Sequence, residues 1–342
     1  MKKWILAIAL ILSGLLAGCG NSQPELYVYN WGDYIDESVL KDFEKQYKIK
    51  VIYDTFTTNE DMYVKVKAGG SHYDVIIPSD YMIKRMIDEE MLEKLDFANI
   101  PNFKLIGSSY KSLGYDPQDE YSVPYMWGTV GILYNTKLVN PAPDSWKILW
   151  DQQYAKQILM LDSQRDSIGI TLKMLGHSLN SKNTAELEAS KKALHDQKPL
   201  VLAYVVDEVK DKMISEEAAL AVVWSGDAVF CIDENPDLNY VIPKEGSNLW
   251  FDAMVIPKGA NHKKEAEQFI NFMCDTEIAY RNASYIGYAS PQLEAVQKLP
   301  KEVTENRSFY PQPEDLKNSE VFVDLGAMIK EFDRVWTEVK AE

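Results

Sequence analysis

The chain has 342 residues, of which 46% are hydrophobic, and its formal net charge is −16. A chain of this length has enough apolar residues for about two ordinary domains. Nucleic acids are bound by basic surfaces, so the negative charge argues against a nucleic-acid partner. The charge suits a cationic ligand, and it suits equally well an acidic surface that serves solubility alone.

The N-terminus has the pattern of a bacterial export signal. Lys2 and Lys3 precede an apolar run that is shorter than the roughly 20 residues needed to span a bilayer. Small residues then lead directly into Cys19, a pattern similar to the lipobox of bacterial lipoproteins. We therefore expect a lipoprotein signal peptide at 1–18, a lipid on Cys19 and a tether at 19–24. The mature chain would be exported and lipid-anchored to the outer face of the cell membrane, or periplasmic.

From residue 25 onward, strand and helix patterns alternate along the chain. In chain order, we expect strands and helices as follows: strand 25–31, helix 36–47, strand 49–56, helix 59–68, strands 73–78, 129–134 and 158–161, helices 168–178 and 184–195, strands 218–224, 238–242 and 249–257, and helices within 263–286. Asp36 is in the position of an N-cap for the first helix. Alternation of this kind predicts an α/β fold with a largely parallel sheet and helices on both faces.

No long Gly- or Ser-rich linker interrupts this alternation. We therefore expect two α/β lobes between which the chain crosses more than once. Lobe 1 is predicted at 25–128 plus 252–296, and lobe 2 at 129–251 plus 297–342. Ligands of such folds bind in a cleft at the carboxyl ends of strands.

Aromatic and acidic residues recur together just after or within the predicted strands. Examples are Trp31 with Asp33, Trp224 with Asp227, and Trp250 with Asp252. Aromatic faces attract ammonium groups, and carboxylates bind them by charge-assisted hydrogen bonds, so the combination suits an aliphatic polycation. Taken singly, each residue is equally explained as a core ring or a helix cap.

Several segments carry a resemblance to a known family: 26–31, 73–79, 121–128, 242–246, 266–273 and 286–288. Over essentially the whole mature length the chain resembles the periplasmic spermidine/putrescine-binding proteins of polyamine ABC transporters. The resemblance implies the type II periplasmic-binding-protein fold, in which two α/β lobes close around a ligand cleft. It also implies a monomer that hands its polyamine to ABC permease subunits, without a cofactor or metal.

The same resemblance implies a set of ligand-binding residues. It comprises an aromatic box, acids and one polar contact: Trp31, Tyr34, Tyr81, Trp224, Trp250 and Tyr288; Asp33, Asp166, Asp227 and Asp252; and Ser79. Asp33 and Asp166 replace Glu of the spermidine-binding branch, Ser163 replaces a second acid and Phe322 a Gln, whereas Asp227 matches the putrescine-binding branch. These four acids would neutralise either cation, and we expect spermidine as the ligand, with putrescine also accepted.

Two alternatives remain open at this point. Paired acids beside aromatic rings also occur in glycosidases, but the four histidines are scattered and no catalytic or zinc motif is present. We therefore expect no enzyme activity. A protein of the same fold could instead bind another small cation or an amino acid, whose carboxylate would require an arginine. Arg165 is the candidate near the cleft, and we expect it to be structural, paired with Asp162 or Asp166.

Overall fold

The computed structural model describes residues 23–69 and 72–341. The predicted signal peptide, Cys19 and most of the predicted tether lie outside these residues. Within the described part, no helix combines the length and the apolar character needed to cross a membrane.

The strands of the described residues form one sheet of nine, in the order β2-β1-β3-β9-β4-β7-β5-β6, with β8 paired to β4. Their bounds are β1 Glu25–Trp31, β2 Lys50–Phe56, β3 Val75–Ile76, β4 Ser122–Asn135, β5 Ile158–Leu161, β6 Val201–Val205, β7 Leu220–Trp224, β8 Leu238–Val241 and β9 Leu249–Val255. β1 pairs parallel with β2 and β3, and β5 pairs parallel with β6 and β7. The pairs that involve β4 are antiparallel.

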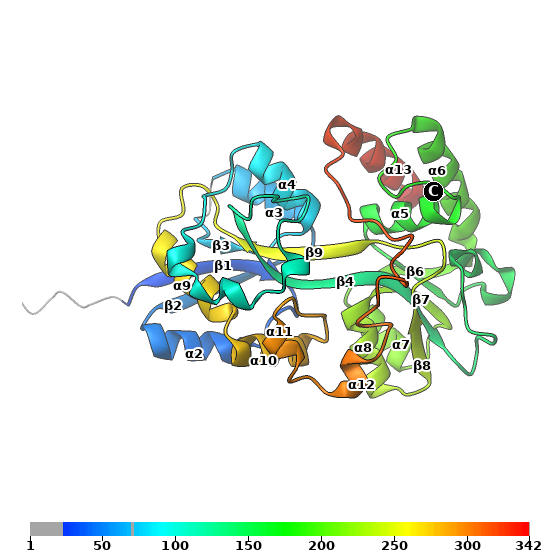
Figure 1. Ribbon diagram of the computed structural model, residues 1–342. Helices are drawn as coiled ribbons and strands as arrows, with labels where there is room; N and C mark the ends of the chain where they lie inside the picture. The colour runs from blue at the N-terminus through cyan, green and yellow to red at the C-terminus, as the bar shows by residue number, and fades with distance from the viewer. Residues whose placement is uncertain (1–22, 70–71, 342) are drawn as a thin grey trace, which may run out of the picture.

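Two long strands join the two lobes (Figure 1). The first half of β4, from Ser122 to Thr129, pairs with β9, and its second half pairs with β7 and β8. The chain crosses once more after residue 289, because Trp127 bonds to Ala289 in the first lobe and Ser308 bonds to Tyr240 in the second. The lobe boundaries at 128/129, 251/252 and 296/297 stay a prediction.

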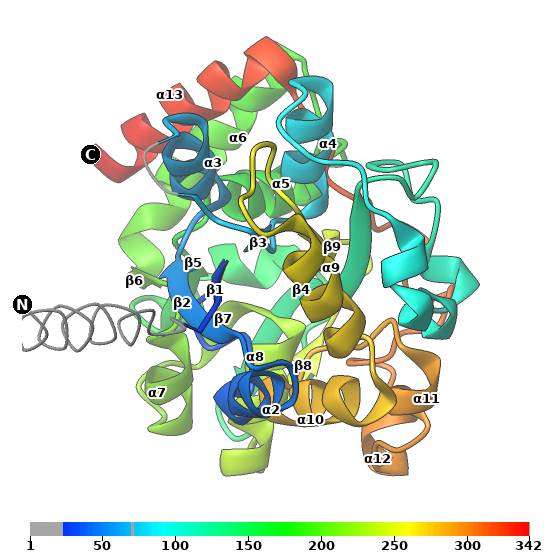
Figure 2. The same cartoon turned by 90° about the vertical axis from the view of Figure 1, so that its left-hand side faces the viewer.

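Helices cover both faces of the sheet (Figure 2). In the first lobe they are α2 Glu37–Tyr47, α3 Asn59–Lys67, α4 Asp80–Asp88, α9 Lys263–Met273, α10 Thr276–Ile286 and α11 Leu293–Val296. In the second lobe they are α5 Gln164–Met174, α6 Thr184–Gln197, α7 Val209–Ile214, α8 Ser225–Glu234 and α13 Ile329–Ala341, and the short α12 Lys301–Thr304 lies on the returning segment. Such layering buries both faces of the sheet.

The first helix forms as its sequence predicts. The side chain of Asp36 accepts a hydrogen bond of 2.9 Å from the backbone nitrogen of Ser38, which satisfies one of the free N–H groups at the helix start. Val39, Leu40 and Phe43 are buried on one face of α2. The alternation of strands and helices and this N-cap are therefore confirmed. The expected largely parallel sheet is wrong, because the pairs that involve β4 and the pair of β3 with β9 are antiparallel.

The predicted helix at 168–178 was placed four residues too late. α5 begins at Gln164, where the Ser163 side chain accepts a hydrogen bond from the backbone nitrogen of Asp166. All its residues from Arg165 to Lys173 are buried. A helix buried on all sides has no apolar stripe, so its sequence carries no periodic signal at its start.

The predicted strand at 129–134 is the second half of β4, which begins at Ser122. Pro124 cannot donate a hydrogen bond to a sheet, and the pairing register with β9 shifts between Pro124 and Met126. A proline inside a strand pattern argues against a central strand, and here the irregularity accommodates it.

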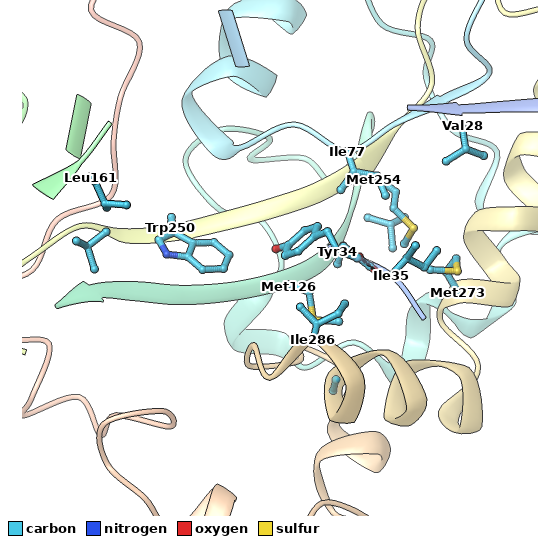
Figure 3. Close-up of a cluster of buried hydrophobic side chains, with 14 of the residues drawn as sticks. Val28, Tyr34, Ile35, Ile77, Met126, Leu161, Trp250, Met254, Met273 and Ile286 are labelled. Atoms are coloured by element: carbon cyan, nitrogen blue, oxygen red, sulfur yellow. Dashed lines mark hydrogen bonds between the residues drawn. The ribbon is translucent and has the colours of Figure 1, made fainter. Parts of the chain in front are cut away.

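The largest apolar cluster runs through both lobes and reaches the cleft. It includes Val28, Ile77 and Met254 of the first lobe and Leu161 of the second. Tyr34 and Trp250 belong to the same cluster and lie along β4 and β9 (Figure 3). Both rings pack against this cluster and also line the cavity, so the packing holds them in one orientation toward the cleft.

Candidate functional site

A cavity of about 430 Å³ lies between the two lobes, since its lining residues come from both. All eleven residues predicted to bind ligand line it: Trp31, Asp33, Tyr34, Ser79, Tyr81, Asp166, Trp224, Asp227, Trp250, Asp252 and Tyr288. Their role in ligand binding stays a prediction, but their common location is a property of the structure.

The fold collects these residues because most of them follow strands. Trp31 ends β1, Ser79 precedes α4, and Trp224 ends β7. Asp166 and Asp227 lie in the first turns of α5 and α8. The unpaired N–H groups at a helix start favour nearby negative charge, so this position partly offsets the cost of burying the two carboxylates.

Asp252 is a buried acid that the first lobe contributes to the cavity. It is 6% exposed, and its Oδ2 accepts a hydrogen bond of 2.8 Å from the Tyr34 hydroxyl. Its Oδ1 has no hydrogen-bond partner among the described residues. Burial raises the pKa of Asp252 to about 6, against the opposing effect of Ser79 and Tyr34. A buried carboxylate with a free oxygen is costly until a cation binds it.

Asp166 is the corresponding acid of the second lobe. It is 6% exposed and accepts hydrogen bonds from the Ser163 hydroxyl at 2.7 Å and from Asn248 Nδ2 at 3.2 Å. Burial raises the pKa of Asp166, and these two hydrogen bonds oppose the shift. Because the carboxylate fixes which side of the amide faces it, Asn248 Oδ1 is left without a partner. Asn248 also lines the cavity, so a free acceptor lies beside Asp166.

Three aromatic rings contact one another near Asp252. The ring centroids of Trp250 and Tyr288 are 5.1 Å apart at 86°, and those of Tyr34 and Tyr288 are 5.5 Å apart at 68°. Gly226 allows this arrangement, because a Cβ built there would lie 2.3 Å from Cδ1 of Tyr288. Such edge-to-face pairs hold the rings in fixed orientations.

The remaining predicted rings lie further along the cavity. Trp31 packs on Phe56 with a centroid distance of 4.5 Å. The Tyr81 hydroxyl accepts a hydrogen bond of 3.0 Å from Asn59 and donates one of 3.1 Å to Glu60. Trp224 packs half-buried against the main apolar cluster. The cavity therefore combines ring faces with carboxylates along its length.

Asp33 and Asp227 lie beside a lysine that the sequence did not point to. Lys210 of α7 donates a hydrogen bond of 3.0 Å to Asp33 Oδ2, and the Asp33 side chain is 72% exposed. Asp227 is half-buried, and the Tyr288 hydroxyl lies 3.4 Å from its Oδ2. Burial raises the pKa of Asp227 to about 6, and the charge of Lys210 opposes the shift.

The expected pairing of Arg165 with Asp162 or Asp166 is wrong. The Arg165 guanidinium donates to the carbonyl oxygen of Val323 and to Asn180 Oδ1, and Asp162 pairs instead with Lys340 at 2.9 Å. Arg165 is 3% exposed and lies over the rings of Tyr81 and Phe322 at 4.9 and 4.3 Å. These contacts with the backbone and rings are not revealed by sequence spacing, and the structural role of Arg165 stays a prediction.

The cavity lining is strongly acidic. Two of its residues, Arg165 and Lys210, are basic, and ten are acidic: Asp33, Glu60, Asp61, Asp80, Asp162, Asp166, Asp207, Asp227, Asp252 and Asp333. A cleft with one sign of charge concentrates ligands of the opposite sign. Across residues 23–69 and 72–341, no group of three or more histidine, cysteine or acidic side chains is arranged to hold a metal ion.

Comparison with known proteins supports the same interpretation. The family described as "Bacterial extracellular solute-binding protein" matches residues 38–310. The spermidine/putrescine-binding periplasmic protein of Escherichia coli is 34% identical, with 100% of this chain and 99% of that protein covered.

Two solved structures are also similar. One is a Listeria monocytogenes protein described as a spermidine/putrescine ABC transporter, with 44% identity, a TM-score of 0.90 and coverage of 93% of this chain and 99% of that one. The other is the spermidine/putrescine ABC transporter substrate-binding protein PotD of Streptococcus pneumoniae, with 42% identity, a TM-score of 0.81 and coverage of 93% and 98%. The chain therefore belongs to the bacterial extracellular solute-binding proteins: it has the type II periplasmic-binding-protein fold and is a binding protein, not an enzyme.

Proposed function

We propose that the chain captures a polyamine, spermidine or putrescine, and delivers it to the permease subunits of an ABC importer. The observation that carries this proposal is the free Oδ1 of Asp252, a buried carboxylate oxygen beside the contacting rings of Tyr34, Tyr288 and Trp250. The relatives whose names include spermidine and putrescine support the same ligand class.

The chemistry of a polyamine matches this cavity in two ways. Its ammonium groups can satisfy the buried carboxylates of Asp252 and Asp166, which removes the cost of keeping them ionised away from water. Its methylene chain can lie against the aromatic faces, which also attract the adjacent ammonium groups by about 0.5–2 kcal/mol each. The eleven cavity residues named above are our candidates for these contacts.

An amino acid is a less suitable ligand. Its carboxylate would require a basic partner in a cavity where acids greatly outnumber bases. The Arg165 guanidinium already donates to Val323 and Asn180. Another small cation is therefore the alternative that most closely competes with a polyamine.

The proposed delivery role also requires a location outside the cytoplasm. We propose that the chain is a monomer and that a lipid on Cys19 anchors it to the outer face of the cell membrane. The alternative location is the periplasm. Two acyl chains on one residue are sufficient for stable anchoring. Replacing Cys19 by Ala should release the chain from washed membranes, and a variant that stays in the membrane fraction would contradict the anchor.

Thermal unfolding of the chain without its lipid tests the ligand. We expect putrescine or spermidine at 100-fold excess over its dissociation constant to stabilise the protein by about 2.7 kcal/mol. Glutamate and glucose are small-molecule controls that are not polycations, and neither should change the unfolding temperature. Stabilisation by glutamate but by neither polyamine would contradict the proposed function.

A further inference from the structure

Five of the ten acids that line the cavity lie at three positions, each of which includes a predicted ligand-binding residue. The first is Asp166, whose pKa is affected by the charges of Arg165 and Glu60. The second is Asp252, which contacts Tyr34. The third acidic position is Asp227 with Asp33 and Asp207, whose charges act on one another.

A cation of the chain itself occupies the third acidic position. Lys210 projects from α7 of the second lobe, and its Nζ lies 3.0 Å from Oδ2 of Asp33 in the first lobe. Its side chain is only 17% exposed. Burial alone would lower the pKa of Lys210, but the negative charges of Asp227, Asp33 and Asp207 outweigh burial and raise it. The ammonium group is therefore held charged inside the cleft.

The other two acidic positions differ in this respect. Among residues 23–69 and 72–341, no lysine or arginine makes an ion pair with Asp166 or Asp252. Each position also has a buried oxygen without a partner, Oδ1 of Asp252 and Oδ1 of the neighbouring Asn248. Two positions are thus unfilled and the third is filled, so the chain leaves room for two ligand ammonium groups.

We propose that Lys210 acts as a built-in ammonium group at the third acidic position and makes the cavity selective for a linear diamine over a triamine. This inference rests on the polyamine binding proposed above. A third ligand ammonium would have to displace Lys210 or lie next to it. Two positive charges in neighbouring positions of one cleft repel each other. The four predicted acids alone could neutralise either polyamine, whereas counting Lys210 among the cations leaves charge for two ligand ammonium groups and favours putrescine.

Calorimetric titration with putrescine and with spermidine tests the inference on three proteins: the unaltered chain, Lys210→Gln and Lys210→Arg. The unaltered chain should bind putrescine more tightly than spermidine. In Lys210→Gln, the ratio of spermidine affinity to putrescine affinity should rise at least tenfold, because the third position becomes available to the ligand. Lys210→Arg keeps a cation there and should keep the original ratio.

The outcomes separate this inference from the proposed function. If both polyamines bind but the ratio is the same in Lys210→Gln as in the unaltered chain, Lys210 merely links the lobes and the inference is wrong. The same follows if the unaltered chain binds spermidine more tightly than putrescine, a result that needs no variant to fold. If neither polyamine binds the unaltered chain, the proposed function itself fails, and the inference with it.

Discussion

Asp252 and Asp33 are two acids of the first lobe that line one cavity in opposite surroundings. Asp252 is 6% exposed, has one oxygen without a partner, and forms no ion pair with any described residue. The Asp33 side chain is 72% exposed and already bonded to Lys210. Asp252 therefore lacks a cationic partner, whereas Asp33 already has one in Lys210.

This difference shows that an acid can line the cavity without contributing much to the affinity for a ligand. A solvated charge that already has a partner gains little from a second one, because exposed ion pairs contribute about 0–1 kcal/mol. A buried charge without a partner gains much more, because its desolvation cost is recovered only when the ligand arrives. Five predictions test this contrast, from the largest expected effect to the smallest.

Replacing Asp252 by Asn should have the largest effect. The change keeps the size of the side chain and removes the charge that a ligand ammonium would neutralise, so polyamine affinity should fall at least tenfold and up to about a hundredfold. Calorimetry measures the affinity, and thermal unfolding of the free variant checks that it folds. An affinity equal to that of the unaltered chain would remove Asp252 from the site.

Lowering the pH should weaken binding by about tenfold. The pKa of Asp252 and that of Asp227 are raised from 3.8 to about 6, so a large fraction of each becomes protonated between pH 7 and pH 5. A protonated carboxyl offers no charge to an ammonium, and one pKa unit corresponds to about 1.4 kcal/mol. Titrations at pH 7, 6 and 5 measure the change, and a constant affinity across this range would contradict it.

The free protein should respond to pH in the opposite direction. A carboxyl whose pKa is raised by folding binds protons more tightly in the folded state, so its burial penalty is present above pH 6 and is relieved as the pH falls from 6 towards 3.8. When the pH is lowered from 7 to 5, the free energy of unfolding should therefore increase less in Asp252→Asn than in the unaltered chain. Equal gains in the two proteins would show that Asp252 has an ordinary pKa.

Replacing Tyr34 by Phe should have a smaller effect. The variant keeps the ring but removes the hydroxyl that donates to Asp252 Oδ2 at 2.8 Å. Loss of one hydrogen bond to a buried acid should weaken polyamine affinity about threefold to tenfold and shift the pH dependence upwards. Tyr81→Phe is a matched control, because its hydroxyl bonds to Asn59 and Glu60 instead. A pH profile identical to that of the unaltered chain would contradict the role of Tyr34.

Replacing Asp33 by Asn should have the smallest effect, a change in polyamine affinity of less than about threefold. The side chain is exposed and its charge is already paired, and Lys210 retains Asp227 and Asp207 as neighbours. Calorimetry beside Asp252→Asn makes the comparison direct, since both variants lose one negative charge. A loss in Asp33→Asn as large as in Asp252→Asn would show that overall charge, not burial, controls binding.

The sequence predicted the cavity lining better than the boundaries of the elements. Acidic and aromatic residues that follow strands meet at one edge of a sheet, so the location of Asp166, Asp227 and Trp31 follows from topology. The start of α5 could not be predicted because the helix is buried on all sides. The full length of β4 was hidden by Pro124, whose effect the local shift in register accommodates.

The partners of charged residues were not predictable in the same way. Lys210 meets Asp33 across the cleft, 177 positions apart in the chain, and lies in a short helix that had no clear pattern. The contacts of Arg165 with Val323 and Asn180 likewise depend on how the returning C-terminal segment packs. Local sequence patterns describe which residues share an element, but not which distant elements they face.

The continuity of β4 has a mechanical consequence. Because its two halves belong to different lobes and share one uninterrupted backbone, any opening of the cleft must bend or twist this strand and its partner β9, with no slack loop to absorb the motion. Gly128 lies next to the point where the pairing of β4 passes from β9 to β7, and a Cβ built there would be 2.5 Å from the Trp250 ring. Bending of β4 and β9 at this point would therefore move the Trp250 ring, which lines the cavity.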